Sequence, residues 1–209
     1  MPTRPTFDDK SAARAHVWSA MREARVARFP FPIRGRIPNF AGAERAAERL
    51  FELEPFASAR AIKCNPDSPQ RPVRERALRL GIQVYLPTPR LTGGFHHLDP
   101  NRIPPARLRD ASVMSKALSF ADPVALDDLP QLDAIICGSV AVTEDGRRCG
   151  KGHGFADLEN AILHELGHAP VPMATTVHEL QVVEGFPWES TDVRLQAVVT
   201  PEDAYETGA

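Results

Sequence analysis

The chain has 209 residues, of which 43% are hydrophobic and 25% are charged, and its formal net charge is −2. This length suits one domain with a sizeable core, and the composition is typical of a globular protein rather than a disordered one. The slightly acidic balance argues against a protein that binds nucleic acid through its bulk charge.

The N-terminal segment lacks the apolar stretch of a signal peptide, and the chain nowhere approaches the ~20 consecutive apolar residues of a membrane-spanning helix. Cys64, Cys137 and Cys149 are widely spaced and form no CxxC pair, which is typical of free thiols in a reducing compartment. We therefore expect a cytoplasmic protein that binds neither membranes nor nucleic acid.

The first half of the chain alternates between helical and extended patterns. It predicts helices over residues 9–28, 41–53 and 72–80 and strands over residues 59–64 and 82–86. Ala13, Val17, Ala20 and Ala24 form a narrow apolar stripe along the first helix. The stretch from Pro87 to Asp110 is rich in Pro, Gly and His, so we expect a long loop of the kind that binds ligands or closes as a lid.

The second half continues the alternation. It predicts strands over residues 132–137, 140–142, 171–177 and 193–199 and a helix over residues 155–166, before a short acidic tail. The apolar run at residues 132–137 suits a central strand covered on both faces. The helix carries Phe155, Leu158, Ile162 and Leu166 on one face. These elements predict an α/β fold, with a mostly parallel sheet between helices on both sides, in a single domain over residues 1–209.

The segment RRCGKGHGFAD at residues 147–157 carries the strongest functional signal. Gly150, Gly152 and Gly154 stand at alternate positions, where they let the backbone approach an anion closely. They lead into a helix whose first N–H groups are unpaired and whose dipole is positive at that end. The spacing is not that of a Walker A loop.

Side chains add charge to the same loop. Arg148, Lys151 and His153 supply donors for a phosphate, and Asp157 in the first helical turn is placed to hold Mg²⁺ beside it. From the residues alone, a glycine-rich turn with a carboxylate that stabilises the helix start is an open alternative.

This segment resembles the signature R-L-G-x-G-x-G-Y-Y-D of the 5-formyltetrahydrofolate cyclo-ligase family. The positions that match are Arg148, Gly150, Gly152, Gly154 and Asp157. The preceding segment from Cys137, CGSVAV, is similar to the family's P-G-V-A-F. Lys10 and Arg14 resemble its N-terminal K-x-x-x-R, and the segment from Asn65 resembles its E-V-D-T, with Asp67 in place of Glu.

The resemblance implies a three-layer α/β/α fold of the NagB/RpiA/CoA transferase-like type. It implies ATP- and Mg²⁺-dependent cyclisation of 5-formyltetrahydrofolate, a reduced folate, to 5,10-methenyltetrahydrofolate, with ADP and phosphate as the other products, by a monomer or weak dimer. The implied ATP-binding residues are Lys10, Arg14, Arg148, Gly150, Lys151, Gly152, His153 and Gly154. Arg148 and Lys151 are the implied catalytic residues, Asp67 and Phe155 the substrate-binding residues, and Asp157 the metal ligand.

The sequence departs from the family pattern at the paired tyrosines, which are Phe155 and Ala156 here. The insert from Arg28 to Phe40 and the motif NPDxPQ resemble a branch, the methenyltetrahydrofolate-synthetase-domain proteins. A second hypothesis is therefore a protein of the same fold that binds a nucleotide or phospho-ligand for regulation and has lost folate chemistry.

A third hypothesis is a zinc hydrolase, because residues 164–168 read HELGH and match HExxH. On a helix, this motif places two histidines on one metal ion. Here Gly167 and Pro170 predict that the helix ends before His168, so His168 is expected past the C-cap.

Other side chains carry weaker signals. His96 and His97 either line a substrate site or belong to a solvated loop, and His178 either contacts a ligand or is structural. Cys149 is a candidate for a pKa lowered by a helix N-terminus. The arginines of the second and third helices, Arg74 among them, are expected to form a solvated face paired with glutamates.

Overall fold

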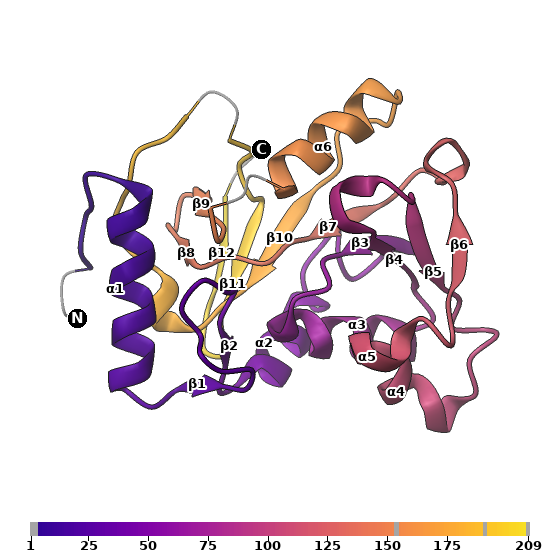
Figure 1. Ribbon diagram of the computed structural model, residues 1–209, viewed down its shortest axis with the longest axis horizontal. Coiled ribbons are helices and arrows are strands. Elements are labelled where there is room, and N and C mark those ends of the chain that lie inside the picture. Colours follow the sequence, from indigo (N-terminus) through magenta and orange to yellow (C-terminus); the bar gives the residue numbers. More distant parts are fainter. Residues whose placement is uncertain (1–3, 153–154, 190–191, 208–209) are drawn as a thin grey trace.

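An eight-stranded sheet runs through the middle of the molecule (Figure 1). The computed structural model describes residues 4–152, 155–189 and 192–207, without the side chains of residues 155–158 and 160. In spatial order, the strands are β12 (Ala204–Glu206), β11 (Ala197–Val199), β10 (Met173–Thr176), β7 (Ala134–Ile136), β3 (Ala61–Cys64), β4 (Gln83–Pro87), β5 (Phe95–Leu98) and β6 (Asp122–Val124). The five strands from β11 to β4 are parallel, and the strands outside them pair antiparallel.

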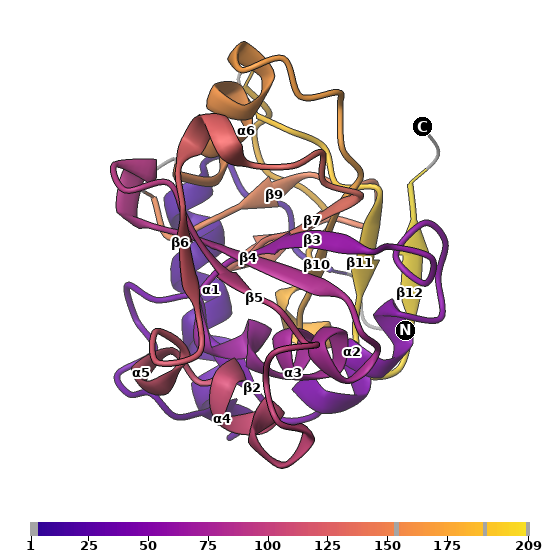
Figure 2. The ribbon, with the colours of Figure 1, turned by 90° about the vertical axis from the view of Figure 1, so that its right-hand side faces the viewer.

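Helices cover both faces of this sheet, which confirms the predicted three-layer α/β/α fold. In chain order, the helices are α1 (Lys10–Glu23), α2 (Ala43–Leu50), α3 (Arg71–Arg79), α4 (Leu108–Ser112), α5 (Met114–Ala117) and α6 (Phe155–Glu165). Figure 2 shows α6 above the sheet and α2 to α5 below it. No helix among the described residues is both long and apolar enough to cross a bilayer.

Within residues 4–152, 155–189 and 192–207, two short ribbons and five 3-10 turns complete the fold. The ribbons pair β1 (Ala27–Arg28) with β2 (Asn39–Phe40) and β8 (Ala141–Val142) with β9 (Arg148–Cys149). The 3-10 turns are η1 (Ser68–Gln70), η2 (Pro89–Leu91), η3 (Pro105–Arg107), η4 (Leu126–Asp128) and η5 (Glu179–Gln181).

The core is built on both sides of the central strands. In β7 all three residues are at most 1% exposed, as the apolar run at residues 132–137 predicted. One apolar cluster joins the sheet to α2, α3, α4 and α5, and a second cluster joins its other face to α6. A third cluster packs α1 against β8 and the segment before α2.

The first helix is shorter than predicted. It ends at Glu23, and Arg25 has a positive φ of 57°, which turns the chain into β1. Its buried face runs through Ala13, Val17 and Met21, whereas Ala20 is only partly buried. The buried face continues from Val17 to Met21, one helical turn later, and not to Ala20 as predicted.

The long loop predicted from Pro87 to Asp110 is wrong. Phe95–Leu98 forms β5, which pairs with β4 in a hairpin and with β6 on its other side. In the connection, the Thr88 hydroxyl donates to the Gly94 carbonyl at 2.8 Å and accepts from the Gly93 N–H at 3.0 Å. The acidic tail contains a strand that was not predicted, because β12 pairs with β11.

The apolar face predicted for the helix at residues 155–166 is wrong at Leu166, whereas Ile162 packs against the core as predicted. The structure buries Glu159 and Leu163, leaves Ile162 partly buried and exposes Leu166 by 39%. The helix therefore turns Glu159 and Leu163 to the protein interior and Leu166 to solvent. The side chains of Phe155 and Leu158 lie outside the described residues.

His178 has a structural role that makes stability depend on pH. Its Nδ1 atom accepts a hydrogen bond from the Leu180 N–H at 3.1 Å at the start of η5. Burial lowers the pKa of His178, so the folded protein keeps this imidazole neutral. The unfolded chain, with an ordinary histidine pKa of about 6.5, binds the proton first as the pH falls, so stability is lost on acidification through that range.

We expect the free energy of unfolding to fall more between about pH 7.5 and pH 5.5 in the wild type than in His178→Asn, because only in the wild type does unfolding let this histidine take up a proton. Urea denaturation at both pH values measures the difference. His164→Asn, at an exposed position, is the control and should behave as the wild type does. An equal loss in wild type and His178→Asn would contradict this role.

Candidate functional site

A cavity of about 1030 Å³ opens beside the carboxyl ends of the central parallel strands. Residues that follow β3, β4 and β7 line it: Asn65 to Asp67, Thr88 to Arg90, and Gly138. Parallel strands end at one edge of a sheet, so loops that are distant in sequence meet there, and ligands bind preferentially at this place in open α/β sheets.

Of the five arginines and lysines that line the cavity among the described residues, four come from two distant parts of the chain, and the fifth, Arg90, comes from η2. Lys10 and Arg14 come from α1, and Arg148 and Lys151 come from β9 and the turn after it. The Arg14 Nε atom donates to the Gly150 carbonyl at 2.7 Å, which ties α1 to the glycine loop. The structure thus brings together the two segments that were predicted to supply the phosphate-binding residues.

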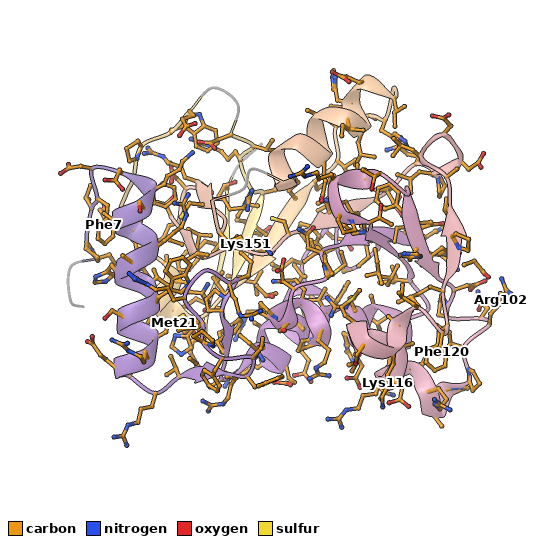
Figure 3. The ribbon with its side chains drawn as sticks, viewed as in Figure 1. Phe7, Met21, Arg102, Lys116, Phe120 and Lys151 are labelled. Atoms are coloured by element: carbon orange, nitrogen blue, oxygen red, sulfur yellow. The ribbon has the colours of Figure 1, made fainter. Side chains whose placement is uncertain are left out.

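Both lysines of this group contact carboxylates. Lys10 Nζ lies 2.6 and 2.7 Å from the two Asp192 oxygens and 3.1 Å from Glu189 Oε1. Burial alone would lower the pKa of Lys10, but these hydrogen bonds outweigh it and raise the pKa above its ordinary value. Lys151, labelled to the right of α1 in Figure 3, lies with Nζ 3.2 Å from Asp67 Oδ1. A bound phosphate would compete with these carboxylates for the ammonium groups.

The glycines of the loop leave room for the guanidinium groups. Gly152 has φ of +101°, a conformation that L side chains rarely adopt, and a Cβ there would lie 3.6 Å from the Arg14 guanidinium carbon. A Cβ at Gly150 would lie 3.1 Å from Arg148 Nη1. Arg148 is 6% exposed and donates from Nη1 to the Gly138 carbonyl at 3.1 Å. A side chain at Gly150 would therefore crowd Arg148, and one at Gly152 would strain the backbone.

Arg74 holds the loop that carries Asp67, and the prediction that it lies on a solvated face is wrong. It is 1% exposed and donates to the carbonyls of Asn65, Asp67 and Ser112 at 2.7, 3.2 and 3.0 Å. Its place one turn before the buried Leu78 was the signal that could have revealed this. Burial lowers the pKa of Arg74.

A buried ion pair beside the cavity was also not predicted. Lys63 on β3 and Glu159 on α6 approach to 2.5 Å, with side chains only 1% and 7% exposed. Glu159 lines the cavity. Both residues lie in apolar stretches, where local patterns gave no sign of a charged partner.

Several predicted positions remain as predictions. His153 and Gly154 lie outside the described residues, and so do the side chains of Phe155 and Asp157. The helix α6 begins at Phe155, which puts Asp157 in its first turn, where the sequence placed it.

The structure separates the other candidates. His96 lines the cavity, whereas His97 stacks on Tyr85 with ring centroids 4.5 Å apart and an interplanar angle of 5°. Cys149 is 2% exposed on β9, and burial raises the pKa of its thiol, so the expected lowering is wrong.

The two histidines of the HExxH match do not share a helix. The helix α6 contains His164 but ends at Glu165, and Gly167 with φ of +83° leads to His168 beyond it, as predicted. Within the part of the chain that the structure describes, no group of three or more metal-ligating side chains converges. The geometry gives the zinc-hydrolase hypothesis no support.

Fold and cavity together define a three-layer α/β protein with a cationic, glycine-lined cavity at the carboxyl ends of its central strands. The model of the 5-formyltetrahydrofolate cyclo-ligase family matches residues 8–201, and the chain belongs to this family.

Relatives confirm the predicted branch. The chain is 40% identical to the methenyltetrahydrofolate synthase domain-containing protein of Mus musculus, over 95% of this chain and 55% of that protein. The Homo sapiens protein of the same name is 35% identical, over 100% of this chain and 56% of its own length. The chain thus spans about half the length of these relatives. The 5-formyltetrahydrofolate cyclo-ligase of Escherichia coli (strain K12) is 29% identical over 78% of this chain and 90% of its own length.

Solved structures show the same fold. The NMR structure of Aquifex aeolicus 5,10-methenyltetrahydrofolate synthetase superposes with a TM-score of 0.59 at 17% identity, covering 96% of this chain and 93% of that one. The synthetase from Mycoplasma pneumoniae gives a TM-score of 0.53 at 14% identity, covering 91% and 98%.

Proposed function

We propose that this protein is an ATP-dependent cyclo-ligase that converts 5-formyltetrahydrofolate to 5,10-methenyltetrahydrofolate, with Mg²⁺, and releases ADP and phosphate. The observation that carries the proposal is the meeting of Lys10, Arg14, Arg148 and Lys151 around one cavity, in a chain of this family. The relative in Escherichia coli that bears the name of the activity supports the same reaction.

Positioning and charge neutralisation would be the main tasks of the protein in such a reaction. The formyl oxygen attacks the γ-phosphorus of ATP and ADP leaves. N10 then attacks the activated carbon and loses its proton, and phosphate leaves with the former formyl oxygen. Lys151 and Arg148, together with the amides of the glycine loop, would stabilise the negative charge on the transferred phosphoryl group.

The residues fit a metal-bound polyphosphate. Asp157 stands in the first turn of α6, next to the glycine loop, and we propose it as the carboxylate that holds Mg²⁺. When bound, the ion would neutralise part of the phosphate charge. Asp67 and Phe155 remain our proposed contacts to the folate, for which Pro87, Pro89 and Met114 provide apolar cavity walls.

We also propose that the protein acts in the cytoplasm as a monomer or weak dimer. The three cysteines are buried in the structure and no disulfide joins them, which suits a reducing compartment.

The growth of methenyl absorbance on mixing the protein with Mg-ATP and 5-formyltetrahydrofolate tests the reaction. We expect Asp157→Ala to lower the rate by about 10²-fold or more, because the metal would lose a protein ligand. The variant Asp128→Ala, at an exposed carboxylate on η4, is the control and should keep the wild-type rate. Full turnover in Asp157→Ala would reject the metal role. ATP binding by the wild type without turnover would instead favour a nucleotide-binding regulatory protein of the same fold.

A further inference from the structure

The buried pair of Lys63 and Glu159 has no part in the chemistry above. Lys63 lies on the face of β3 that points to α6, and its neighbours in register, Tyr85 and Ile135, belong to the apolar cluster that contains Leu163. A charged side chain that is 1% exposed therefore lies in largely apolar surroundings. Its Nζ atom is 2.5 Å from Glu159 Oε2, and Asn65 Oδ1 lies at 3.4 Å.

Stability alone does not account for this pair. Two buried charges lose their hydration, and replacing such a pair by apolar side chains is often neutral or stabilising. The arrangement is also asymmetric, because Glu159 lines the cavity and Lys63 lies behind it. The lysine thus fixes the position of a carboxylate at the cavity wall.

A carboxylate in this place suits a ligand that donates hydrogen bonds. An ionised carboxylate only accepts, and each of its oxygens has two lone pairs. Glu159 Oε2 is buried beside Lys63, so Oε1 is the oxygen that remains to accept from two adjacent N–H groups. The cations that line the cavity suit phosphate, whereas Pro87, Pro89 and Met114 offer apolar surface for a flat ring. The cavity therefore combines an anion site, an apolar wall and one fixed acceptor.

We propose that Glu159, held by Lys63, binds the N–H edge of a 2-amino-4-oxopyrimidine ring. This edge presents an exocyclic amino group beside a ring N–H. It occurs in the pterin of a reduced folate and in the guanine of a nucleotide, whereas adenine lacks the adjacent ring N–H. That the ring is a pterin rests on the proposed function. Glu159 would then recognise the pterin end of the folate.

Calorimetric titration of the full chain tests this assignment with 5-formyltetrahydrofolate, GTP and ATP as separate ligands. Glu159→Gln keeps the size of the side chain but replaces one acceptor by a donor. We expect its affinity for 5-formyltetrahydrofolate to fall about 10- to 100-fold, and its affinity for ATP to stay within about twofold. Unchanged affinity for the folate would overturn the proposal.

A double variant provides a test if Glu159→Gln does not fold, since that change leaves Lys63 buried without its counter-charge. Lys63→Met combined with Glu159→Leu removes both charges, and we expect it to melt near the wild-type temperature. The wild type should prefer 5-formyltetrahydrofolate over its 2-desamino-2-methyl analogue by about tenfold or more, and the double variant should bind the two alike. If the folded double variant preferred 5-formyltetrahydrofolate over the analogue as strongly as the wild type does, the proposal would be contradicted.

The outcomes separate this inference from the proposed reaction. Suppose that the wild type forms the methenyl product and the variants still prefer 5-formyltetrahydrofolate over its 2-desamino-2-methyl analogue. The proposed reaction would then stand, and the role of Glu159 would be overturned. Binding of GTP that is lost in Glu159→Gln, without any folate binding, would support the carboxylate and assign it to guanine, against the folate reaction. A wild type that binds neither compound would overturn the inference.

Discussion

Replacing Lys151 by methionine is expected to lower the rate of methenyl formation by about 10²- to 10³-fold, the usual effect of removing one donor that stabilises charge in a transition state. Lys151 follows Gly150 in the loop, and its Nζ atom lies 3.2 Å from Asp67 Oδ1 at the cavity wall. Methionine keeps most of the side-chain volume and removes the charge, so the loop itself should be little disturbed. Single-turnover absorbance at saturating Mg-ATP measures the chemical step.

Lys116→Met is the matched control. Lys116 is a lysine on α5 whose ammonium group pairs with Asp110, and it lies at the lower right of Figure 3, away from Lys151. We expect this variant to keep the wild-type rate and melting temperature. If Lys151→Met turned over as fast as Lys116→Met, Lys151 would have no catalytic role, whatever its effect on ATP affinity.

The place of the glycine loop at the cavity could be predicted because the signal lies in local sequence. Alternate glycines, adjacent basic residues and a following helix all lie within one short segment, and each has a direct physical meaning. The structure adds what the segment alone cannot give, namely that Arg14 from α1 donates to Gly150. The resemblance to the family pointed to Arg14, but the residues of the loop did not.

The charged residues inside the protein could not be predicted in the same way. A pattern that sorts residues by polarity predicts that Lys63, Arg74 and Glu159 are exposed to solvent. Their partners lie far away in sequence, so the local pattern does not reveal them. The misplaced face of α6 has the same cause, since a helix with a buried carboxylate and an exposed leucine contradicts the apolar periodicity.

The hairpin of β4 and β5 escaped prediction for a different reason. Its second strand has four residues, FHHL, of which only Phe95 and Leu98 are fully buried, so no alternation of apolar and polar residues appears. Glycines and prolines around it indicated a loop. What stabilises the strand is its pairing on both sides, which is tertiary information.

Replacing Arg74 by methionine is expected to lower the free energy of unfolding by roughly 3 kcal/mol, because three carbonyls, two of them in buried hydrogen bonds, would each lose a charged donor. Through these carbonyls, Arg74 connects the loop of Asn65 and Asp67 to Ser112, at the end of α4. The change should therefore loosen the wall that carries Asp67 as well as the core.

Urea denaturation measures the loss, and Arg76→Met, at an exposed position of the same helix, should stay within about 0.5 kcal/mol of the wild type. The site gives an independent readout. If Arg74 positions Asp67, the variant at a temperature where it is fully folded should show a raised KM for the folate, and Arg74→Lys should recover part of it through one of the three hydrogen bonds. A destabilised variant with an unchanged KM would assign Arg74 to the core alone and remove its part in placing Asp67.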